Sequence, residues 1–334
     1  MYGFGQSDLQ PAAIVKLTKS EPITVKQFRT EVARMEIAAG RSLNESEKKQ
    51  VLDAMINERL AIQAADRDRI TLSEGEVNQQ IQQLKDALSQ RAGRQVTEAE
   101  FASAIKSETG LEMPAFREQA RRQLIVQKYL LSKKQSLFEN IKEPTDAEVL
   151  EIFNLSKAQF VRPETVRFSY IRIPYGSDKA KAKELADRLY KEVGSNSSKF
   201  NELALKGQIA NSGYQGGDGG YLPRMLEAQQ FFGSEFVNVA FNLKLEEVSK
   251  LMESPSGQFT GYQFIKVTEA YSMKNLELDD IYRLGVPMTV RDTIRYSLYQ
   301  EKQQALLAQA TEELVTELRA GGKSFEIYNK NLGW

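Results

Sequence analysis

The side chains that most often carry acid–base and nucleophilic chemistry are missing from this sequence. Its 334 residues include no histidine and no cysteine, which removes the commonest general base, the thiolate nucleophile and the usual structural zinc ligands. Carboxylate, lysine and tyrosine chemistry remains open, but the sequence shows no local cluster of these groups. We therefore predict a protein that acts by holding a partner, and we expect no cofactor and no metal ion.

The overall composition narrows the classes of partner. Lys+Arg and Asp+Glu number 45 each, and no basic run reaches five residues, so we expect no nucleic-acid binding. The apolar content of 41% and charged content of 27% are typical of a globular protein. No apolar stretch approaches the roughly 18–20 residues that a transmembrane helix needs, so we expect no transmembrane segment.

Residues 1–13 lack the apolar run of a signal peptide. The stretch from Gly3 to Pro11, with its Gly, Gln, Ser and Pro residues, is also what the start of a mature exported protein looks like. A chain without cysteine suits an oxidising or a reducing compartment equally. Composition alone therefore leaves the location open.

Residues 14–158 are predicted to be mostly helical after one short strand at Ala12–Leu17. A capping box, in which a polar N-cap side chain is followed three residues later by Glu or Gln, marks the start of a helix. Apolar stripes at helical spacing follow each such pair, and we interpret them as core positions of an irregular helical domain. The predicted pairs are Thr24–Gln27, Asn44–Glu47, Ser73–Glu76, Thr97–Glu100 and Thr145–Glu148.

Residues 159–272 change character and predict a compact α+β unit. The expected order is strand, helix, short helix, a glycine cluster at Gly213–Gly220, a helix capped by Ser234, and two closing strands. From Val290 to Leu318 a long amphipathic helix follows, ending at Gly321-Gly322. The short strand expected at Ser324–Tyr328 has residues 12–17 as its best partner, which would join the two chain ends around the α+β unit.

The sequence thus predicts a multi-domain α and α+β protein. We place an N-terminal helical domain at residues 1–160 and the α+β domain at 161–272. Residues 273–334 then supply a helix and a strand that pack back on the N-terminal domain.

The α+β unit resembles a parvulin-type peptidyl-prolyl isomerase domain. Five short motifs carry the resemblance in the family's order, namely Val166–Ile171, Phe200–Ala204, Gly216–Tyr221, Phe236–Phe241 with Glu247–Ser249, and Gly261–Val267. The flanking regions are similar to the SurA/PrsA group of extracytoplasmic foldases, on the segments Ile23–Phe28 and Asn57–Ala61 and on the order of the domains.

The resemblance implies an unusual catalytic site, because the family's polar positions hold other residues. Tyr170 and Gln263 stand at the two histidine positions, Ala210 stands where the family usually has Cys or Asp, and Thr260 retains the Ser/Thr near the closing strand. We therefore assign no catalytic residue among the four and predict weak or absent isomerase activity. Gly216, Gly217, Gly219 and Gly220 indicate turn geometry rather than a phosphate cradle, since no P-loop lysine or following Ser/Thr accompanies them.

The apolar part of the family's site is better retained. Leu222, Phe232 and Phe236 fall where the family lines its proline pocket, which makes them the candidate peptide-binding residues. The alternative interpretation is that the phenylalanines are simply core residues.

Three functions remain open. The first hypothesis is an ATP-independent chaperone of periplasmic or otherwise extracytoplasmic location that binds unfolded or extended client polypeptides. The second is a working peptidyl-prolyl cis/trans isomerase that assists envelope protein folding, and the third is a structural partner in an envelope assembly. The oligomeric state and the identity of the clients cannot be predicted from the sequence.

Overall fold

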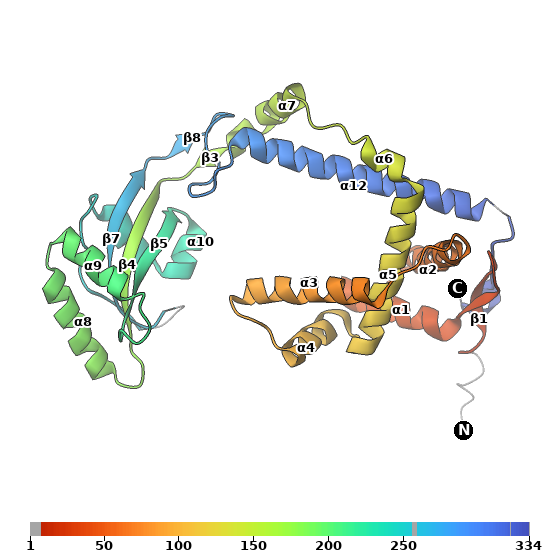
Figure 1. The fold of residues 1–334 in the computed structure, drawn as a ribbon, viewed down its shortest axis with the longest axis horizontal. Coiled ribbons are helices and arrows are strands. Elements are labelled where there is room, and N and C mark those ends of the chain that lie inside the picture. The colour runs from red at the N-terminus through yellow and green to blue at the C-terminus, as the bar shows by residue number, and fades with distance from the viewer. Residues whose placement is uncertain (1–7, 256–258, 321, 334) are drawn as a thin grey trace. The chain divides into compact units, whose positions relative to one another are not determined.

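The computed structural model describes residues 8–255, 259–320 and 322–333 (Figure 1). Packing divides the chain into two units, one formed by Met1–Lys142 with Glu301–Trp334 and the other by Glu143–Gln300. We call them the helical unit and the inserted unit. The predicted fold class is confirmed: a helical region drawn from both ends of the chain accompanies an inserted α+β domain.

The inserted unit ends within helix α12 (Val290–Arg319), between Gln300 and Glu301. Our proposed domain boundaries at residues 160 and 272 follow the change in sequence character instead, and they stay predictions. The predicted helix stop at Gly321 and the segment Gly3–Ser7 lie outside the described residues.

The capped helices of the helical unit begin at the residues that the sequence predicts. All five expected capping boxes are formed, four in this unit and one, at Thr145, in the inserted unit. At Ser73, for example, the hydroxyl accepts from the Glu76 backbone N–H at 3.2 Å, and the Glu76 carboxylate accepts from the Ser73 N–H at 2.7 Å. The helices of this unit are α1 (Val25–Ala39), α2 (Glu45–Arg67), α3 (Glu74–Ala92), α4 (Glu98–Thr109), α5 (Met113–Lys133), α6 (Gln135–Glu139) and the later part of α12.

A small sheet ties the two ends of the chain together in the helical unit. Its strand order is β2 (Glu21–Thr24), β1 (Pro11–Val15), β9 (Phe325–Ile327). β1 and β9 pair antiparallel, with Ala13 opposite Ile327 and Val15 opposite Phe325. This pairing confirms the partner that the sequence suggested for its last strand.

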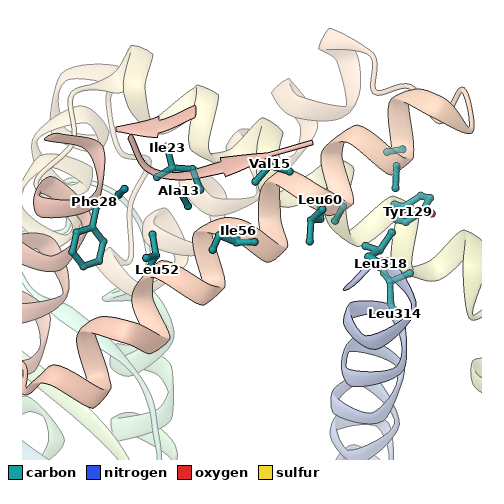
Figure 2. Packing of buried hydrophobic residues seen from close by; sticks show 14 of the residues in the cluster. Ala13, Val15, Ile23, Phe28, Leu52, Ile56, Leu60, Tyr129, Leu314 and Leu318 are labelled. Carbon is teal, nitrogen blue, oxygen red and sulfur yellow. The ribbon is translucent and has the colours of Figure 1, made fainter. Parts of the chain in front are cut away.

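The core of the helical unit joins this sheet to the four helices α1, α2, α5 and α12. Figure 2 shows Val15 of β1, Leu60 of α2, Tyr129 of α5 and Leu314 of α12 in one buried cluster. Val15 and Leu60 have no exposed surface, and Leu314 is 5% exposed. Burial of this kind contributes roughly 1.5–3 kcal/mol for a large aliphatic side chain. The buried leucines of α12 therefore stabilise this core in the same way as those of the N-terminal helices.

The inserted unit is built on a four-stranded antiparallel sheet of order β5-β4-β7-β6. Helices α8 and α9 cover one face through a core that includes Ile171 and Ile173 of β4, and α10 and α11 cover the other through Val166 and Phe168 (Figure 1). The elements are α7 (Asp146–Ser156), β3 (Val161–Arg162), β4 (Thr165–Pro174), α8 (Lys179–Val193), α9 (Ser197–Lys206), β5 (Gln215–Pro223), α10 (Leu226–Phe232), α11 (Ser234–Asn242), β6 (Met252–Ser254), β7 (Gly261–Tyr271), β8 (Lys274–Asn275) and the first residues of α12.

The glycine cluster differs from the prediction, because it forms strand β5 instead of a turn. The pairing of β4 with β5 is irregular between Phe168 and Ser169, where Gly219 is left without a partner. A Cβ atom on Gly219 would lie 2.2 Å from the Phe168 ring, so only glycine permits this close approach. Ser234 also differs from the prediction: it is the first helical residue of α11, and Gly233, with φ 87°, occupies the cap position.

Within residues 8–255, 259–320 and 322–333, no helix has both the length and the apolar character needed to cross a bilayer.

Candidate functional site

A polar cluster of Arg172, Gln263 and Ser254 lies on the central sheet of the inserted unit. Arg172 of β4 stands opposite Gln263 of β7 in the strand pairing. Its Nε donates to the Gln263 side-chain oxygen at 3.0 Å, and the Gln263 nitrogen donates to Ser254 Oγ at 2.8 Å. Gln263 is 4% exposed, so its buried amide is satisfied by this short chain of hydrogen bonds.

Arg172 is the residue of this cluster that the sequence reasoning missed. Its guanidinium carbon lies 4.5 Å from the ring centre of Tyr170 and 5.3 Å from that of Phe259, distances at which a cation is attracted to an aromatic face. Burial lowers the pKa of Arg172, and no carboxylate of the described residues lies within ion-pair distance of it. Because residues i and i+2 of a strand share a face, the spacing from Tyr170 was a signal that could have found it.

The structure brings only part of the predicted polar set together. Tyr170 and Gln263 lie on adjacent strands, and Tyr170 is opposite Gly217 of β5 and Ile265 of β7. Ala210 is exposed in the connection after α9, and Thr260 is exposed just before β7. The backbone carbonyl of Thr260 accepts from the Tyr175 N–H at 3.3 Å. In the described residues, the hydrogen-bond chain of Arg172, Gln263 and Ser254 includes neither of these two side chains.

The chemistry available to this cluster is hydrogen-bond donation. Arginine stays protonated in proteins, and amide and phenol groups do not titrate near neutral pH. A guanidinium beside aromatic rings can bind and polarise a carbonyl oxygen, but this set contains no group that would exchange a proton near pH 7. This cluster can bind a polar group through hydrogen bonds at a surface that is partly shielded from water.

The candidate peptide-binding residues Leu222, Phe232 and Phe236 share one cluster on the α10–α11 side of the sheet. Leu222 and Phe236 are only 1% and 4% exposed, and the Phe236 ring lies 5.3 Å from that of Phe168. Phe232 is half-buried and stacks on Phe236 at 5.2 Å. Of the three, Phe232 is therefore the side chain with surface to offer a ligand, and the peptide-binding role of the set stays a prediction.

A second concave surface lies within the helical unit, between α1, α2 and α5. Its volume is about 600 Å³. We call it the methionine groove, defined by the apolar side chains Met35, Val51, Met55 and Leu111. Met35 belongs to the apolar stripe that follows the Thr24–Gln27 pair and was predicted to be a core position, whereas it is 39% exposed and lines this groove.

Most of the charged side chains that line the same groove are ion-paired. Arg122 Nε lies 3.3 Å from a Glu58 oxygen, and Arg34 pairs with Glu31 one turn away on α1. Arg59 pairs at 3.0 Å with Glu21, which lies outside the lining. The groove therefore combines flexible apolar side chains with charges that mostly have partners.

The fold and these sites define a class of protein, a helical chaperone-type domain that carries a parvulin-type isomerase domain. Residues 2–130 match the SurA-like N-terminal domain family, and residues 150–271 match the PPIC-type PPIase domain family. The chain therefore carries a SurA-like N-terminal domain and a PPIC-type parvulin domain, SurA chaperones and PrsA foldases are among its homologues, and the predicted resemblance is confirmed.

Two curated relatives illustrate the similarity. The chaperone SurA of Alcanivorax borkumensis is 31% identical over 219 residues, which cover 63% of this chain and 46% of that protein. The foldase PrsA of Clostridium botulinum is 23% identical over 303 residues, covering 88% and 77%. The chain spans about half the length of the SurA relatives it matches.

Solved structures match this chain at low identity and low TM-score. A structure from a study of two SurA-like chaperones of Campylobacter jejuni, one of them described as a periplasmic protein, has 13% identity and a TM-score of 0.40, covering 96% of this chain and 99% of that one. The foldase PrsA of Lactococcus lactis has 12% identity and a TM-score of 0.33, with 96% of each chain covered.

Proposed function

We propose that this protein is an ATP-independent chaperone that holds unfolded polypeptide in the methionine groove of its helical unit. The observation that carries the proposal is the groove itself, a concavity of about 600 Å³ edged by Met35 and Met55 on a domain of the SurA-like family. Methionine side chains are unbranched and polarisable, so they adapt to apolar side chains of different shape. Surfaces of this kind suit loose binding of many partners.

The inserted unit supports a secondary role as a weak isomerase. Turning a prolyl bond means crossing a barrier of about 18–20 kcal/mol. Arg172 offers hydrogen-bond donors that would hold the carbonyl of such a bond, Gln263 and Ser254 support Arg172 from behind, and Phe232 offers limited apolar surface. The altered polar set, with Tyr170, Ala210 and Gln263 at the family's positions, is the reason we propose a low rate.

We infer an extracytoplasmic site of action from the same homology. The relatives are SurA chaperones and PrsA foldases, and both belong to the extracytoplasmic group that the sequence resembles. Fractionation of cells that express the natural gene would test this inference, and recovery of the protein in the cytoplasm alone would contradict it.

The groove is tested by Met35→Glu, which puts a charge on its apolar edge. We expect this variant to need about tenfold more protein than the wild type to suppress aggregation of a chemically unfolded client, because burying a carboxylate against apolar client surface is unfavourable. Ile37→Glu is the matched control, since Ile37 lies on the same helix, is 82% exposed and does not line the groove.

Equal loss in the two variants, or no suppression by the wild type even in large excess, would rule the proposal out. The same samples in a protease-coupled assay on an Xaa-Pro tetrapeptide separate the chaperone from the isomerase. A wild-type rate far above the thermal background, together with no effect of Met35→Glu on aggregation, would make the working isomerase the better description.

A further inference from the structure

The inserted unit has a cavity that lies apart from the positions of Tyr170 and Gln263. It has a volume of about 430 Å³ and lies where β3, the end of β5 and the segment 282–284 come together. We call it the arginine pocket and define it by Arg162, Pro163, Tyr221, Tyr282, Arg283 and Leu284. Its lining contains two arginines and no acidic residue.

The side chain of Arg162 has a hydrogen-bond donor that the surrounding residues do not satisfy. Its Nε atom is buried and has no hydrogen-bond partner in the structure. The guanidinium carbon lies 5.2 Å from the ring centre of Tyr271, so an aromatic face supports the cation without bonding to its N–H groups. A buried donor without a partner is unfavourable, and a ligand oxygen entering the pocket would remove that penalty.

Arg283 places a second positive charge at the same cavity. It is exposed, its guanidinium carbon lies 5.7 Å from the ring centre of Tyr282, and no described carboxylate forms an ion pair with it. A cation on a flexible side chain beside an aromatic ring is well suited to meet an incoming anion.

Three carboxylates on or next to the elements that form the pocket wall already have partners. Glu164 pairs with Arg224 at 2.8 Å, and Glu269 pairs with Arg167 at 2.9 Å. Asp280 pairs with Lys274 at 2.5 Å and accepts from the Glu277 N–H at 2.8 Å. The charge left over at the pocket is therefore positive.

We propose that the arginine pocket binds the carboxylate of an Asp or Glu side chain in an extended client polypeptide. Guanidinium groups bind carboxylates with two parallel hydrogen bonds, and the rings and prolines of the wall would receive the apolar or aromatic residue beside the acid. We assign the carboxylate to a side chain because an unfolded chain offers many acidic side chains and a single C-terminus.

The pocket acts apart from the polar cluster at Tyr170 and Gln263. It includes Thr165 at the start of β4, five residues before Tyr170, which corresponds to roughly 16 Å along an extended strand. The proposal therefore stands or falls independently of isomerase activity and of the methionine groove.

The test measures fluorescence anisotropy of labelled peptides with the full chain. The probe is acetyl-Ala-Ala-Phe-Glu-Ala-Ala-amide, paired with the same peptide carrying Gln in place of Glu. We expect the Gln peptide to bind roughly tenfold more weakly, and Arg283→Gln to abolish most of that difference, since one charge-assisted hydrogen bond accounts for such a factor. Arg162→Gln should do the same.

Arg224→Gln is the matched control, because Arg224 is nearby and ion-paired but does not line the pocket. It should retain the preference for Glu. Arg283 is exposed, so its variant is expected to fold even if Arg162→Gln does not.

Equal affinity of the wild type for the Glu and Gln peptides would overturn the proposal, as would an equal loss in Arg224→Gln and Arg283→Gln. A third peptide, with Gln inside and a free C-terminal carboxylate, distinguishes the source of the anion. If it binds as tightly as the amidated Glu peptide, the assignment to an acidic side chain is wrong.

Discussion

Arg167 organises the charged surface of the central sheet of the inserted unit. Its Nη2 donates to Asp218 of β5 at 2.6 Å and its Nη1 to Glu269 of β7 at 2.9 Å. Glu269 also accepts from the Tyr271 hydroxyl at 2.5 Å and from the Tyr221 hydroxyl at 3.1 Å. Three neighbouring strands are thereby joined through side chains as well as through their backbones.

The ionisation of these residues reflects the same contacts. The hydrogen bond from Arg167 lowers the pKa of Asp218, and those from Tyr271 and then Arg167 lower the pKa of Glu269. The hydrogen bond to Glu269, followed by burial, raises the pKa of Tyr271 to about 12. Each shift favours the protonation state in which the network is intact.

The pH dependence of stability tests this network. A carboxyl whose pKa is lower in the folded state stabilises the fold above its unfolded pKa of about 4, and that contribution is lost as the pH falls through the folded pKa. Arg167→Gln should therefore lower stability at pH 7 and make the loss of stability toward acid shallower than in the wild type. Urea unfolding followed between about pH 7 and pH 3 measures both.

The expected change is small, because exposed ion pairs contribute little. Arg224→Gln, which breaks the exposed pair with Glu164, is the control for losing any arginine from this unit. If the free energy of unfolding fell with decreasing pH in the same way in both variants, Arg167 would have no special role in the sheet.

At the scale of the element, the helix starts are the best-defined feature of the fold. The side chain at each of the five N-caps bonds to the backbone three residues on, and the Glu or Gln there bonds back. The information lies within four consecutive residues, so the sequence alone specifies it.

Ser73→Ala should lower the free energy of unfolding of the helical unit by about 1 kcal/mol, because the N–H of Glu76 loses its acceptor. Ser73→Asp should restore most of it, since the Asp carboxylate accepts the same bond and favours the helix N-terminus. Hydrogen exchange of the first turn of α3 reports the effect locally. An alanine variant as stable as the aspartate variant would show that the cap does not hold α3.

Elements whose conformation depends on distant residues were harder to predict. Strand β5 was expected as a turn because its glycines have low strand propensity, and only the Phe168 ring against Gly219 explains why glycine is required in a strand. Whether Phe236 lined a pocket or filled the core could not be told from its spacing, because both positions are apolar. In the structure Phe236 is buried against Phe168, a residue of another element, and its peptide-binding role stays a prediction.

The candidate sites show the same distinction between local and distant information. Arg172 was within reach of sequence analysis through its alternation with Tyr170. The arginine pocket was not, because its residues come from segments around 162, 221 and 283 that only the tertiary fold brings together. The methionine groove was hidden for another reason: an apolar stripe on a helix predicts burial without saying what covers it.

At the scale of the whole molecule, the helical unit depends on both ends of the sequence for one core. Leu314 and Leu318 of α12 are buried beside Leu60 of α2 and Tyr129 of α5 (Figure 2). Outside this core, Arg319 reaches Asp53 at 2.8 Å and Lys134 reaches Glu317 at 2.7 Å. The C-terminal segment is therefore an integral part of the helical unit.

Leu314→Ala should destabilise the helical unit by about 2–5 kcal/mol, the usual range for emptying a buried leucine site, and should leave the inserted unit unchanged. Hydrogen exchange by mass spectrometry separates the two, because peptides from α2 report the first and peptides from β7 the second. Leu307→Ala, at a position of α12 that is 45% exposed, should have little effect. Parallel loss of protection in α2 and β7 would mean that the two units unfold as one.

The pairing of β1 with β9 has a consequence for how the chain acquires its structure during synthesis. Lys16, which follows β1, and Glu326 of β9 are 310 positions apart, whereas β4 and β7 are joined through contacts about 100 positions apart, such as Arg167 with Glu269 at 102. Closing the longer loop carries the larger entropy cost, and β9 is synthesised long after β1. Strand β2 can pair with one edge of β1 at once, but the other edge must wait for β9, open to other chains, while the segment between has time to fold. This nascent protein thus passes through a stage in which it resembles the incomplete chains that chaperones bind.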